Sequence, residues 1–477
     1  MILRGLLSLL LVCQAANGLA ADPPASLAYL DACRIALEKN PTIRSALAEI
    51  QVAAGNRTAL RSVAFPDLFL SLPGGYQGPR SSADGRFFGI ILADFSQPLF
   101  DLRIPFSFKA GDLGVLVAVH NYWATVNTVL YSIRNAYLAA RFEEDFLVIN
   151  GRNVSANEAV FSELSLREAS GIGRDTERQR AGLLLEKSRS ENLTPPFLRK
   201  VALLEIAALM GWELAPNSQW LDQVRLSDDL TLSAANVDFA SAVAEAKTNR
   251  SDIALLRTLA KQNDALAVVT LSAMLPIISF DINLQSIPSE SAANDSTLIN
   301  TSTGTTGLDS VPTTSDIRND EFQTSVRFGP VATWRAFDGF AALGGYRATS
   351  ARAKADNIRA EALAQRVEIE VRIVQSQLRS ADRLLKLSGS SVATAQNTVD
   401  ASRETLTAPE LDRTLSQFAF AQDDKNALDL RLIELRARYE RGRALATLDF
   451  VTGRNFRLRF VEPPASKLPP NQESYLP

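Results

Sequence analysis

The chain repeats its own pattern, and this internal duplication constrains the fold more than any local motif. Three landmarks occur in both halves of the sequence, at residues 36–43 and 246–253, 65–66 and 275–276, and 100–101 and 337–338. The first two pairs are 210 residues apart (36 to 246, 65 to 275), and the third is 237 apart (100 to 337). The second copy therefore holds 27 additional residues before its Phe-Asp pair (237 minus 210). A repeat of this length predicts two copies of one structural unit.

Residues 1–20 have the features of a secretory signal peptide. A positive flank precedes an apolar core at 6–12, which is too short to span a membrane, and small residues at 18–20 form a cleavage site. Lipidation of Cys13 is disfavoured because a bulky valine precedes it. The mature chain is expected to be exported and to keep one cysteine, Cys33, so no disulfide framework is predicted.

The composition argues against an enzyme, a metal site and a nucleic-acid partner. The formal net charge is −3, which gives no excess of basic residues for nucleic acid. The sequence contains no Gly-rich phosphate loop, Ser-His-Asp set or ligand-spaced cluster, and its one histidine, His120, stands beside Tyr122 and Trp123 as a packed imidazole would. We expect no catalytic residue, no cofactor-binding residue, no metal and no nucleic acid.

Long helices are predicted for most of the chain. Residues 341–388 contain no proline and are rich in helix formers. Two apolar stripes recur at helical spacing, one at Ala355, Ile358, Ala362, Ile369 and Ile373, the other at Leu428, Leu432, Leu435, Tyr439, Gly442 and Ala446. A helix of about 45 residues would be about 70 Å long, too long for a compact globule. Taken alone, these helices would favour a coiled coil.

Four segments of alternating sequence interrupt the helices. Strands are predicted at about 65–78 and 86–99 in the first copy and at about 276–287 and 321–333 in the second, with a polar loop at about 286–320. A soluble hairpin with one wet face would explain one such pair. Two pairs in an exported, duplicated chain favour strands of about 10 residues that cross a bilayer in a barrel. Four strands cannot close a barrel, so several copies of the chain are required.

These features together resemble the TolC-type outer-membrane efflux proteins, the outer membrane factors. The resemblance covers residues 30–454, and its motifs are Asn40-Pro41, 249–253 (Asn-Arg-Ser-Asp-Ile), 97–101 (Gln-Pro-Leu-Phe-Asp) and 334–339 (Trp-Arg-Ala-Phe-Asp-Gly). It implies a mainly α protein with a β-barrel part. Long antiparallel helices would form a periplasmic α-helical barrel, and three chains would share one twelve-stranded barrel, four strands from each.

The resemblance also implies a function, a location and partners. The protein would be a passive homotrimeric exit duct of a tripartite efflux or type I secretion system. It would lie in the outer-membrane lipid of the cell with a large periplasmic part, and work with a periplasmic membrane-fusion adaptor and an inner-membrane pump. The alternative is a periplasmic coiled-coil scaffold or adaptor protein without a membrane barrel.

The resemblance divides the chain into segments. They are a signal peptide at 1–20, a first repeat at 21–237 with a tip turn at about 171–173, a second repeat at 238–454 with a tip turn at about 407–410, and a Pro-rich tail at 455–477. Pro195-Pro196 departs from the family, whose members keep this tunnel helix continuous, because two prolines kink or break a helix.

Three groups of functional residues are expected. The resemblance implies that Gly171, Ile172, Gly173, Ala408 and Pro409 form the periplasmic tips that contact the adaptor. Candidates for the pore constriction are Glu177, Glu410, Asp412 and Thr414, although helix-terminus acids are usually solvated charges. The polar faces of the strands predict a barrel lumen lined by Asp281, Asn283, Gln285, Gln323 and Arg327.

Overall fold

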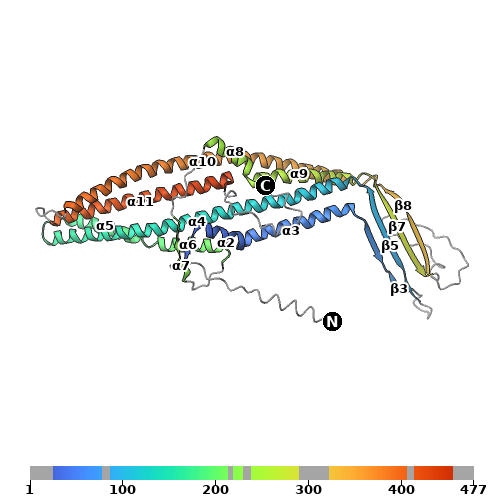
Figure 1. Ribbon diagram of the computed structural model, residues 1–477, viewed down its shortest axis with the longest axis horizontal. Helices are drawn as coiled ribbons and strands as arrows, with labels where there is room; N and C mark the ends of the chain where they lie inside the picture. Colours follow the sequence, from blue (N-terminus) through green and yellow to red (C-terminus); the bar gives the residue numbers. More distant parts are fainter. Residues whose placement is uncertain are drawn as a thin grey trace. The chain divides into compact units, whose positions relative to one another are not determined.

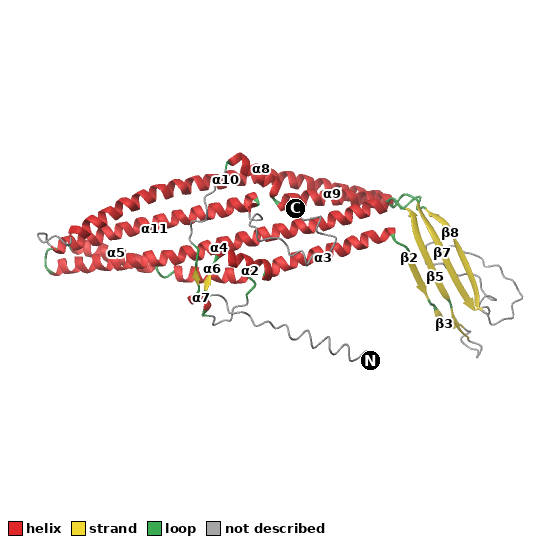
Figure 2. Cartoon of the chain, viewed as in Figure 1, coloured by secondary structure: helices red, strands yellow, loops and turns green. Residues whose placement is uncertain are grey.

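The computed structural model describes residues 25–77, 86–212, 219–228, 238–288, 322–405 and 413–454. Figure 1 traces the chain by colour, and Figure 2 shows that the described part is mostly helical with a separate group of strands. Two compact units are present. Unit 1 contains Met1–Ala46, Tyr122–Ser251 and Ala364–Pro477, and unit 2 contains Leu47–Asn121 and Asp252–Leu363.

The elements follow the duplication. The long helices are α3 (Pro41–Arg61), α4 (Arg103–Ala169), α9 (Ser251–Ser272), α10 (Ala341–Thr405) and α11 (Arg413–Thr452). The shorter helices are α2 (Tyr29–Lys39), η1 (Ser62–Ala64), α5 (Asp175–Glu191), α6 (Pro195–Leu209), α7 (Trp220–Gln223) and α8 (Phe239–Asn249). The strands are β1 (Ser26–Leu27), β2 (Asp67–Ser71), β3 (Gly74–Gln77), β4 (Arg86–Gly89), β5 (Ile91–Phe100), β6 (Arg225–Leu226), β7 (Ile277–Pro288) and β8 (Phe322–Thr333).

In unit 1 the long helices form a wall in the order α5, α4, α11, α10 (Figure 1). Asn150 Nδ2 of α4 donates to the Ser188 carbonyl of α5 at 2.9 Å, and Arg134 Nη1 of α4 pairs with Asp449 Oδ2 of α11 at 2.5 Å. Arg441 Nε of α11 pairs with Asp382 Oδ1 of α10 at 2.6 Å. The wall is held by apolar contacts between its members, such as Leu138, Leu435 and Ala446 with Tyr131, Phe142, Phe146, Ile149 and Tyr439 packed against them.

Smaller elements attach to this wall in unit 1. Strands β1 and β6 pair in parallel, and the Tyr137 hydroxyl of α4 donates to the Leu27 carbonyl at 3.1 Å. Helix α6 is fixed to the α7–β6 segment by Arg199, whose Nη1 and Nη2 donate to the carbonyls of Leu221 and Val224 at 2.9 and 2.5 Å. The backbone carbonyls of Leu27, Leu221 and Val224 thus accept the side-chain hydrogen bonds that fix these smaller elements.

Helices α5 and α6 are separated at the predicted proline pair. The Asn192 and Leu193 amides donate to the carbonyls of Arg189 and Ser190 at 3.1 Å, which closes α5, and Pro195 and Pro196 then occupy the first turn of α6. Proline is tolerated there because first-turn amides have no helical acceptor. The interruption expected from Pro195-Pro196 is therefore present as a new helix start, whereas α4 beside it runs unbroken for 67 residues.

In unit 2 the strands form an antiparallel sheet in the order β2-β5-β7-β8. Strands β7 and β8 pair along all 12 residues without a register shift, from Ile277 opposite Thr333 to Pro288 opposite Phe322. Strands β3 and β4 form a separate two-stranded ladder that keeps the register of β2 and β5, and the Ile90 amide donates to the Pro73 carbonyl at 2.9 Å between the two ladders. One irregularity, between Pro98 and Phe100, lies at the end of β5.

The Phe-Asp landmark of each repeat begins a long helix in unit 2. Asp101 accepts from the Arg103 amide at 2.8 Å at the start of α4, and Asp338 Oδ2 accepts from the Ala342 amide at 2.7 Å at the start of α10. Carboxylates suit this position because they bond to free amides and face the positive end of the helix dipole. The motif therefore marks the point where a strand ends and a helix begins.

One helix in the described part of the chain, α4, is long and apolar enough by composition to cross a membrane, with a mean hydropathy of 1.2 over 18 residues. Buried positions make up 44% of that window. Core helices of soluble proteins share both properties, so the composition of α4 does not by itself indicate a membrane span.

Candidate functional site

The sheet of unit 2 has one polar face, and four of its positions were predicted from the sequence. Asp281, Asn283 and Gln285 alternate along β7 and point to one side, and Arg327 of β8 is paired with Asn283 in the register. Ser96 of β5 pairs with Asp281, and its Oγ donates to Asp281 Oδ1 at 2.6 Å. This face therefore carries both carboxylate and guanidinium groups on neighbouring strands.

Gln323, the fifth predicted lumen residue, lies in β8 opposite Ile287 in the register. The odd-numbered positions of β8 share one face, so Gln323 is on the same side as Arg327 by register alone. Its side chain lies outside the described part of the structure.

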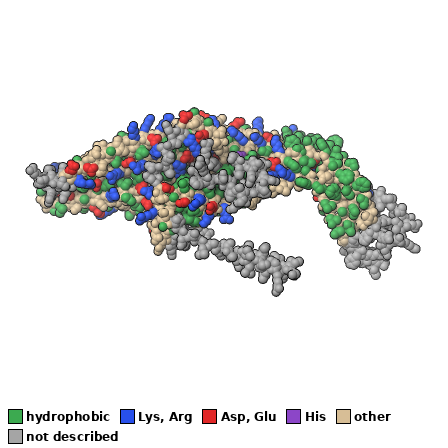
Figure 3. All heavy atoms as spheres, in the orientation of Figure 1, with side chains coloured by type: hydrophobic (Ala, Val, Ile, Leu, Met, Phe, Trp, Pro, Cys, Tyr) green, Lys and Arg blue, Asp and Glu red, His purple; other side chains and the backbone are tan. Residues whose placement is uncertain are grey.

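The other face of the sheet is apolar and exposed. Its cross-strand rows are Leu68, Phe95, Ile282 and Phe328, then Leu70, Ala93, Leu284 and Val326. Phe328 is 75% exposed and Leu68 is 69% exposed. Figure 3 shows hydrophobic side chains gathered over these strands and far fewer charges there than on the helices. A continuous exposed apolar face of this kind marks contact with a membrane or a protein.

Exposed aromatic residues border the sheet where the strands meet the helices. Trp334, Phe337 and Phe340 follow β8, and Phe65 and Phe100 hold the same zone in the first repeat. Trp334 Nε1 donates to the Met274 carbonyl at 3.0 Å, and the Phe337 and Phe340 rings meet edge to face with centroids 5.4 Å apart. Sequence reasoning quoted the 334–339 motif but gave these rings no role. Three aromatic residues within seven positions were the available signal.

In unit 1 the predicted first tip is a tight turn between α4 and α5. The amides of Ile172 and Gly173 donate to the Arg167 carbonyl at 3.0 and 2.9 Å, and Gly171 has a φ of 75°. A Cβ on Gly173 would lie 2.7 Å from the Glu168 nitrogen, so both glycines are needed by the turn. Ile172 between them is 85% exposed. The turn thus presents an isoleucine to its surroundings.

The candidate constriction residues are only partly within the described structure. Glu177 lies in the first turn of α5 and is exposed, with no cation within 4.0 Å among the described residues. Its neighbour Asp175 pairs with Arg178 at 2.8 Å. Ala408, Pro409, Glu410 and Asp412 lie outside the described residues, and Thr414 lies in α11 with a side chain that is not described. Of these candidates, Glu177 is the one whose side chain lies in the described part of the structure.

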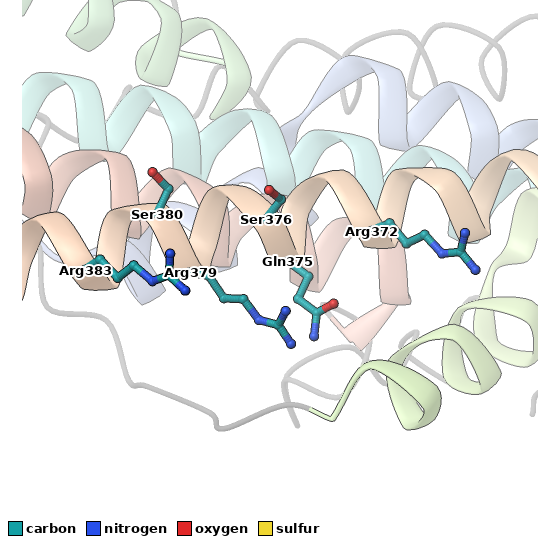
Figure 4. A pocket seen from close by; sticks show the side chains of 6 residues that line it. All are labelled: Arg372, Gln375, Ser376, Arg379, Ser380 and Arg383. Atoms are coloured by element: carbon teal, nitrogen blue, oxygen red, sulfur yellow. The ribbon is translucent and has the colours of Figure 1, made fainter.

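A shallow hollow of about 370 Å³ lies on α10 in unit 1 (Figure 4). Its six lining residues come from one face of this helix: Arg372, Gln375, Ser376, Arg379, Ser380 and Arg383. Arg372 pairs with Glu368 at 2.8 Å and its guanidinium lies 5.5 Å from the centre of the Phe239 ring. A hollow lined by one helix is a stretch of charged surface, and it encloses no ligand-sized cavity.

Titratable groups give no sign of acid–base chemistry within the described ranges. No group of three or more His, Cys, Asp or Glu residues there has the arrangement of a metal site. Burial raises the pKa of the Cys33 thiol to about 12, which leaves it protonated and unreactive at neutral pH. Partial burial lowers the pKa of His120 below its ordinary value. Both residues lie on helices as packed side chains.

Solved channel structures have the same fold. CusC, from a study of transmembrane channel formation, matches with a TM-score of 0.68 and 15% identity over 89% of this chain and 91% of that chain. The open-state MtrE outer membrane channel of Neisseria gonorrhoeae matches with a TM-score of 0.64 and 17% identity, covering 89% and 88%. The CmeC outer membrane channel of Campylobacter jejuni matches with a TM-score of 0.66 and 12% identity, covering 90% and 88%.

No protein-family model matches the sequence, and no curated protein is similar to it in sequence. The likeness is therefore one of structure, and it extends over nine-tenths of the chain from the sheet through the long helices. The chain has the fold of the TolC-type outer-membrane channels.

Proposed function

We propose that this protein is a passive exit duct of the outer membrane, with a large periplasmic part and no enzymatic activity. The observation that carries the proposal is the two-faced sheet: an exposed apolar face with Leu68 and Phe328, and a polar face with Asp281 and Arg327. Lipid on one side and water on the other would satisfy both faces. The solved neighbours named as outer membrane channels support the same reading.

The duct would be a homotrimer with a twelve-stranded barrel. In one chain β2 and β8 are the edges of the sheet, and their unpaired backbone groups cannot remain open in lipid. The wall of unit 1 also has two apolar edges. Helices α5 and α6 and the segment between them expose Leu183, Leu193, Phe197, Val201 and Leu204, and α10 exposes Ile369, Ile373, Leu384 and Leu387. Contacts between copies would cover both kinds of edge.

The partners would be a periplasmic membrane-fusion adaptor and an inner-membrane pump, in tripartite efflux or type I secretion. A duct without a nucleotide site or other energy source needs a pump to drive export. The exposed Ile172 turn is the surface at which we expect the adaptor to dock. Glu177, with Glu410, Asp412 or Thr414 of the second copy, remains our candidate for the constriction.

Negative-stain electron microscopy of the detergent-purified mature protein tests the proposal. We expect cylinders well over 100 Å long with three-fold end views, because α4 alone, with 67 residues, spans about 100 Å. Thin rods that stay soluble without detergent would contradict the duct and support the alternative, a periplasmic coiled-coil scaffold. Planar-bilayer recording on the same preparation provides a second check, since a duct conducts ions and a scaffold does not.

A further inference from the structure

The start of α10 and the residues before it carry positive charge that the chain does not neutralise. Five basic residues lie between positions 334 and 360, at Arg335, Arg347, Arg352, Lys354 and Arg359, against two carboxylates at Asp338 and Asp356. The first four are exposed, and none has a carboxylate within 4.0 Å among the described residues. Isolated exposed cations are common, but four between positions 335 and 354 make this stretch of unit 2 strongly basic.

Both nearby carboxylates are already engaged. Asp338 accepts from the Ala342 amide at the helix start. Asp356 has a side chain that is 6% exposed and accepts from Asn263 Nδ2 at 2.9 Å and from Arg359 Nη1 at 2.9 Å. Neither carboxylate can turn toward the four exposed cations without losing these hydrogen bonds. The positive charge of those cations is therefore available to an anion from outside the chain.

This basic surface is continuous with the exposed aromatic residues at the end of the sheet. Arg335 directly follows Trp334, and Arg347 lies seven residues after Phe340, which is about 10 Å along a helix. Long helical side chains point back toward the helix N-terminus, so the Arg347 guanidinium is expected to extend toward the exposed aromatic residues Trp334, Phe337 and Phe340. In Figure 3, Lys and Arg side chains lie on the helices beside the hydrophobic band of the sheet.

The spacing matches the polar layer of a membrane. Headgroups add about 5–8 Å on each side of the hydrocarbon core, and aromatic residues mark the boundary between the two. Arg335 and Arg347 come within this layer when the sheet spans the core. Arg352 and Lys354 lie about 18 and 21 Å beyond Phe340 along the helix, which is out of reach.

We propose that Arg335 and Arg347 bind the phosphodiester of an anionic glycerophospholipid in the leaflet next to the helices. The proposal rests on the outer-membrane duct described above, and it adds a specific lipid contact. Guanidinium groups bind phosphate with paired, charge-assisted hydrogen bonds, and an anionic headgroup lacks the amine that would offset this attraction in a zwitterionic lipid. The corresponding residues of the first copy, Pro98 and Ala110, are uncharged.

Native mass spectrometry of the detergent-purified protein with added phosphatidylglycerol tests the site. The variant Arg335→Gln/Arg347→Gln should retain at least five-fold less phosphatidylglycerol than the wild type. The matched control, Arg352→Gln/Lys354→Gln, removes the same charge beyond the headgroup layer and should retain as much as the wild type. Equal losses of phosphatidylglycerol in both variants would show that retention depends on net charge alone, which would overturn the site.

Two further measurements distinguish a bound lipid from free phosphate, and a failure of the lipid site from a failure of the proposed duct. Inorganic phosphate at 10 mM should leave the phosphatidylglycerol count unchanged, and displacement by phosphate would overturn the assignment to a lipid. Vesicle flotation then distinguishes the two proposals. If all variants float with vesicles and retain equal lipid, the site is wrong and the duct stands. If the wild type fails to float, the duct is wrong and the lipid site falls with it.

Discussion

At the scale of single residues, two glycines make the same close backbone contact in the two copies of the repeat. Gly211 and Gly453 both have a φ of 70° and follow helices α6 and α11, respectively. A Cβ on Gly211 would lie 2.6 Å from the Lys39 carbonyl oxygen, and one on Gly453 would lie 3.2 Å from that of Asn249. Lys39 and Asn249 are 210 residues apart, so the same close approach occurs once in each copy.

We predict that Gly211→Ala destabilises the protein by more than about 2 kcal/mol, because the left-handed backbone costs about 1–2 kcal/mol and the Cβ clash adds to it. Gly55→Ala in α3 is the control, since its Cβ meets no atom within 4 Å and alanine favours a helix by about 1 kcal/mol. Thermal unfolding of both variants in detergent measures the difference. A Gly211→Ala protein as stable as the wild type would contradict the clash.

A second residue-scale prediction concerns His120, the one histidine of the chain. Its pKa is lowered because partial burial disfavours the charged imidazolium. The unfolded chain therefore binds more protons near and below pH 6.5, so the stability gained from the neutral ring is present above that pH and is lost as the pH falls through the lower folded pKa. His120→Gln should flatten the fall in melting temperature between pH 7 and pH 5. Parallel profiles would contradict this.

At the scale of elements, the sequence predicts strands well and the use of helix faces less well. The four predicted strands correspond to β2 to β5, β7 and β8, because alternation with period two is readable wherever each side of a sheet meets a different environment. The predicted strand at about 65–78 is divided at Pro73 into β2 and β3, because proline cannot donate to the ladder.

The two apolar helix stripes had different outcomes. The stripe of α11 that includes Leu428, Leu435 and Ala446 is buried inside the chain. The stripe of α10 that includes Ile358, Ile369 and Ile373 is exposed, and α10 instead buries Val367, Val371 and Val374. Periodicity identifies an apolar helix face but not the partner that covers it. For the same reason, the tip and lumen candidates could be located only on a known fold.

Neighbouring residues on β8 allow a test of the two faces of the sheet. Val326→Arg places a charge in the apolar row and should destabilise the membrane-inserted protein by about 2–4 kcal/mol near the middle of the bilayer. Ser325→Arg places the same charge on the polar face and should be tolerated. Urea unfolding in vesicles, with the inserted fraction measured by flotation, compares them. Equal losses would mean that the faces are not divided between lipid and water.

The tip turn yields the second element-scale prediction. Ile172→Asp should abolish export that depends on the adaptor while leaving folding unchanged, because the side chain is 85% exposed and makes no core contact. Leu166→Asp, on the last turns of α4 and 62% exposed, is the control for a nearby exposed apolar residue. Growth of a deletion strain on toxic pump substrates reports export, and circular dichroism reports folding. Full export by Ile172→Asp would remove this turn from the adaptor contact.

At the scale of the whole molecule, one chain is incomplete in several places at once. The sheet has two open edges, the wall of unit 1 exposes apolar side chains on α5, α6 and α10, and α10 has a basic hollow and an isoleucine stripe on outward-facing positions. Such edges rarely persist in water or lipid, because both exposed apolar surface and unpaired strands favour association.

We predict that the paired substitution Phe197→Glu/Ile373→Glu converts the assembly to monomers, since it puts charge on both edges of the unit 1 wall. Val148→Glu is the control, because Val148 is equally exposed on α4 but this helix already has a neighbour on each side within the chain. Light scattering in detergent gives the mass of each species. A trimer that survives the paired substitution would show that the barrel alone holds the copies together.

The break between α5 and α6 has a mechanical consequence. Helix α6 is fixed to the α7–β6 segment by Arg199, whereas α5 is fixed to α4, because Arg189 Nη2 pairs with Glu158 Oε1 at 2.8 Å and Asn150 Nδ2 donates to the Ser188 carbonyl at 2.9 Å. Helix α5, with 17 residues and a length of about 25 Å, is therefore coupled to α4, against which Ala181 also packs. A change of angle at residues 192–194 would move α6 relative to the α4–α5 pair and leave the Gly171–Gly173 turn bonded to the end of α4. The proline pair that opens α6 thus divides this side of unit 1 into two parts, and a force on one part need not unfold a helix of the other.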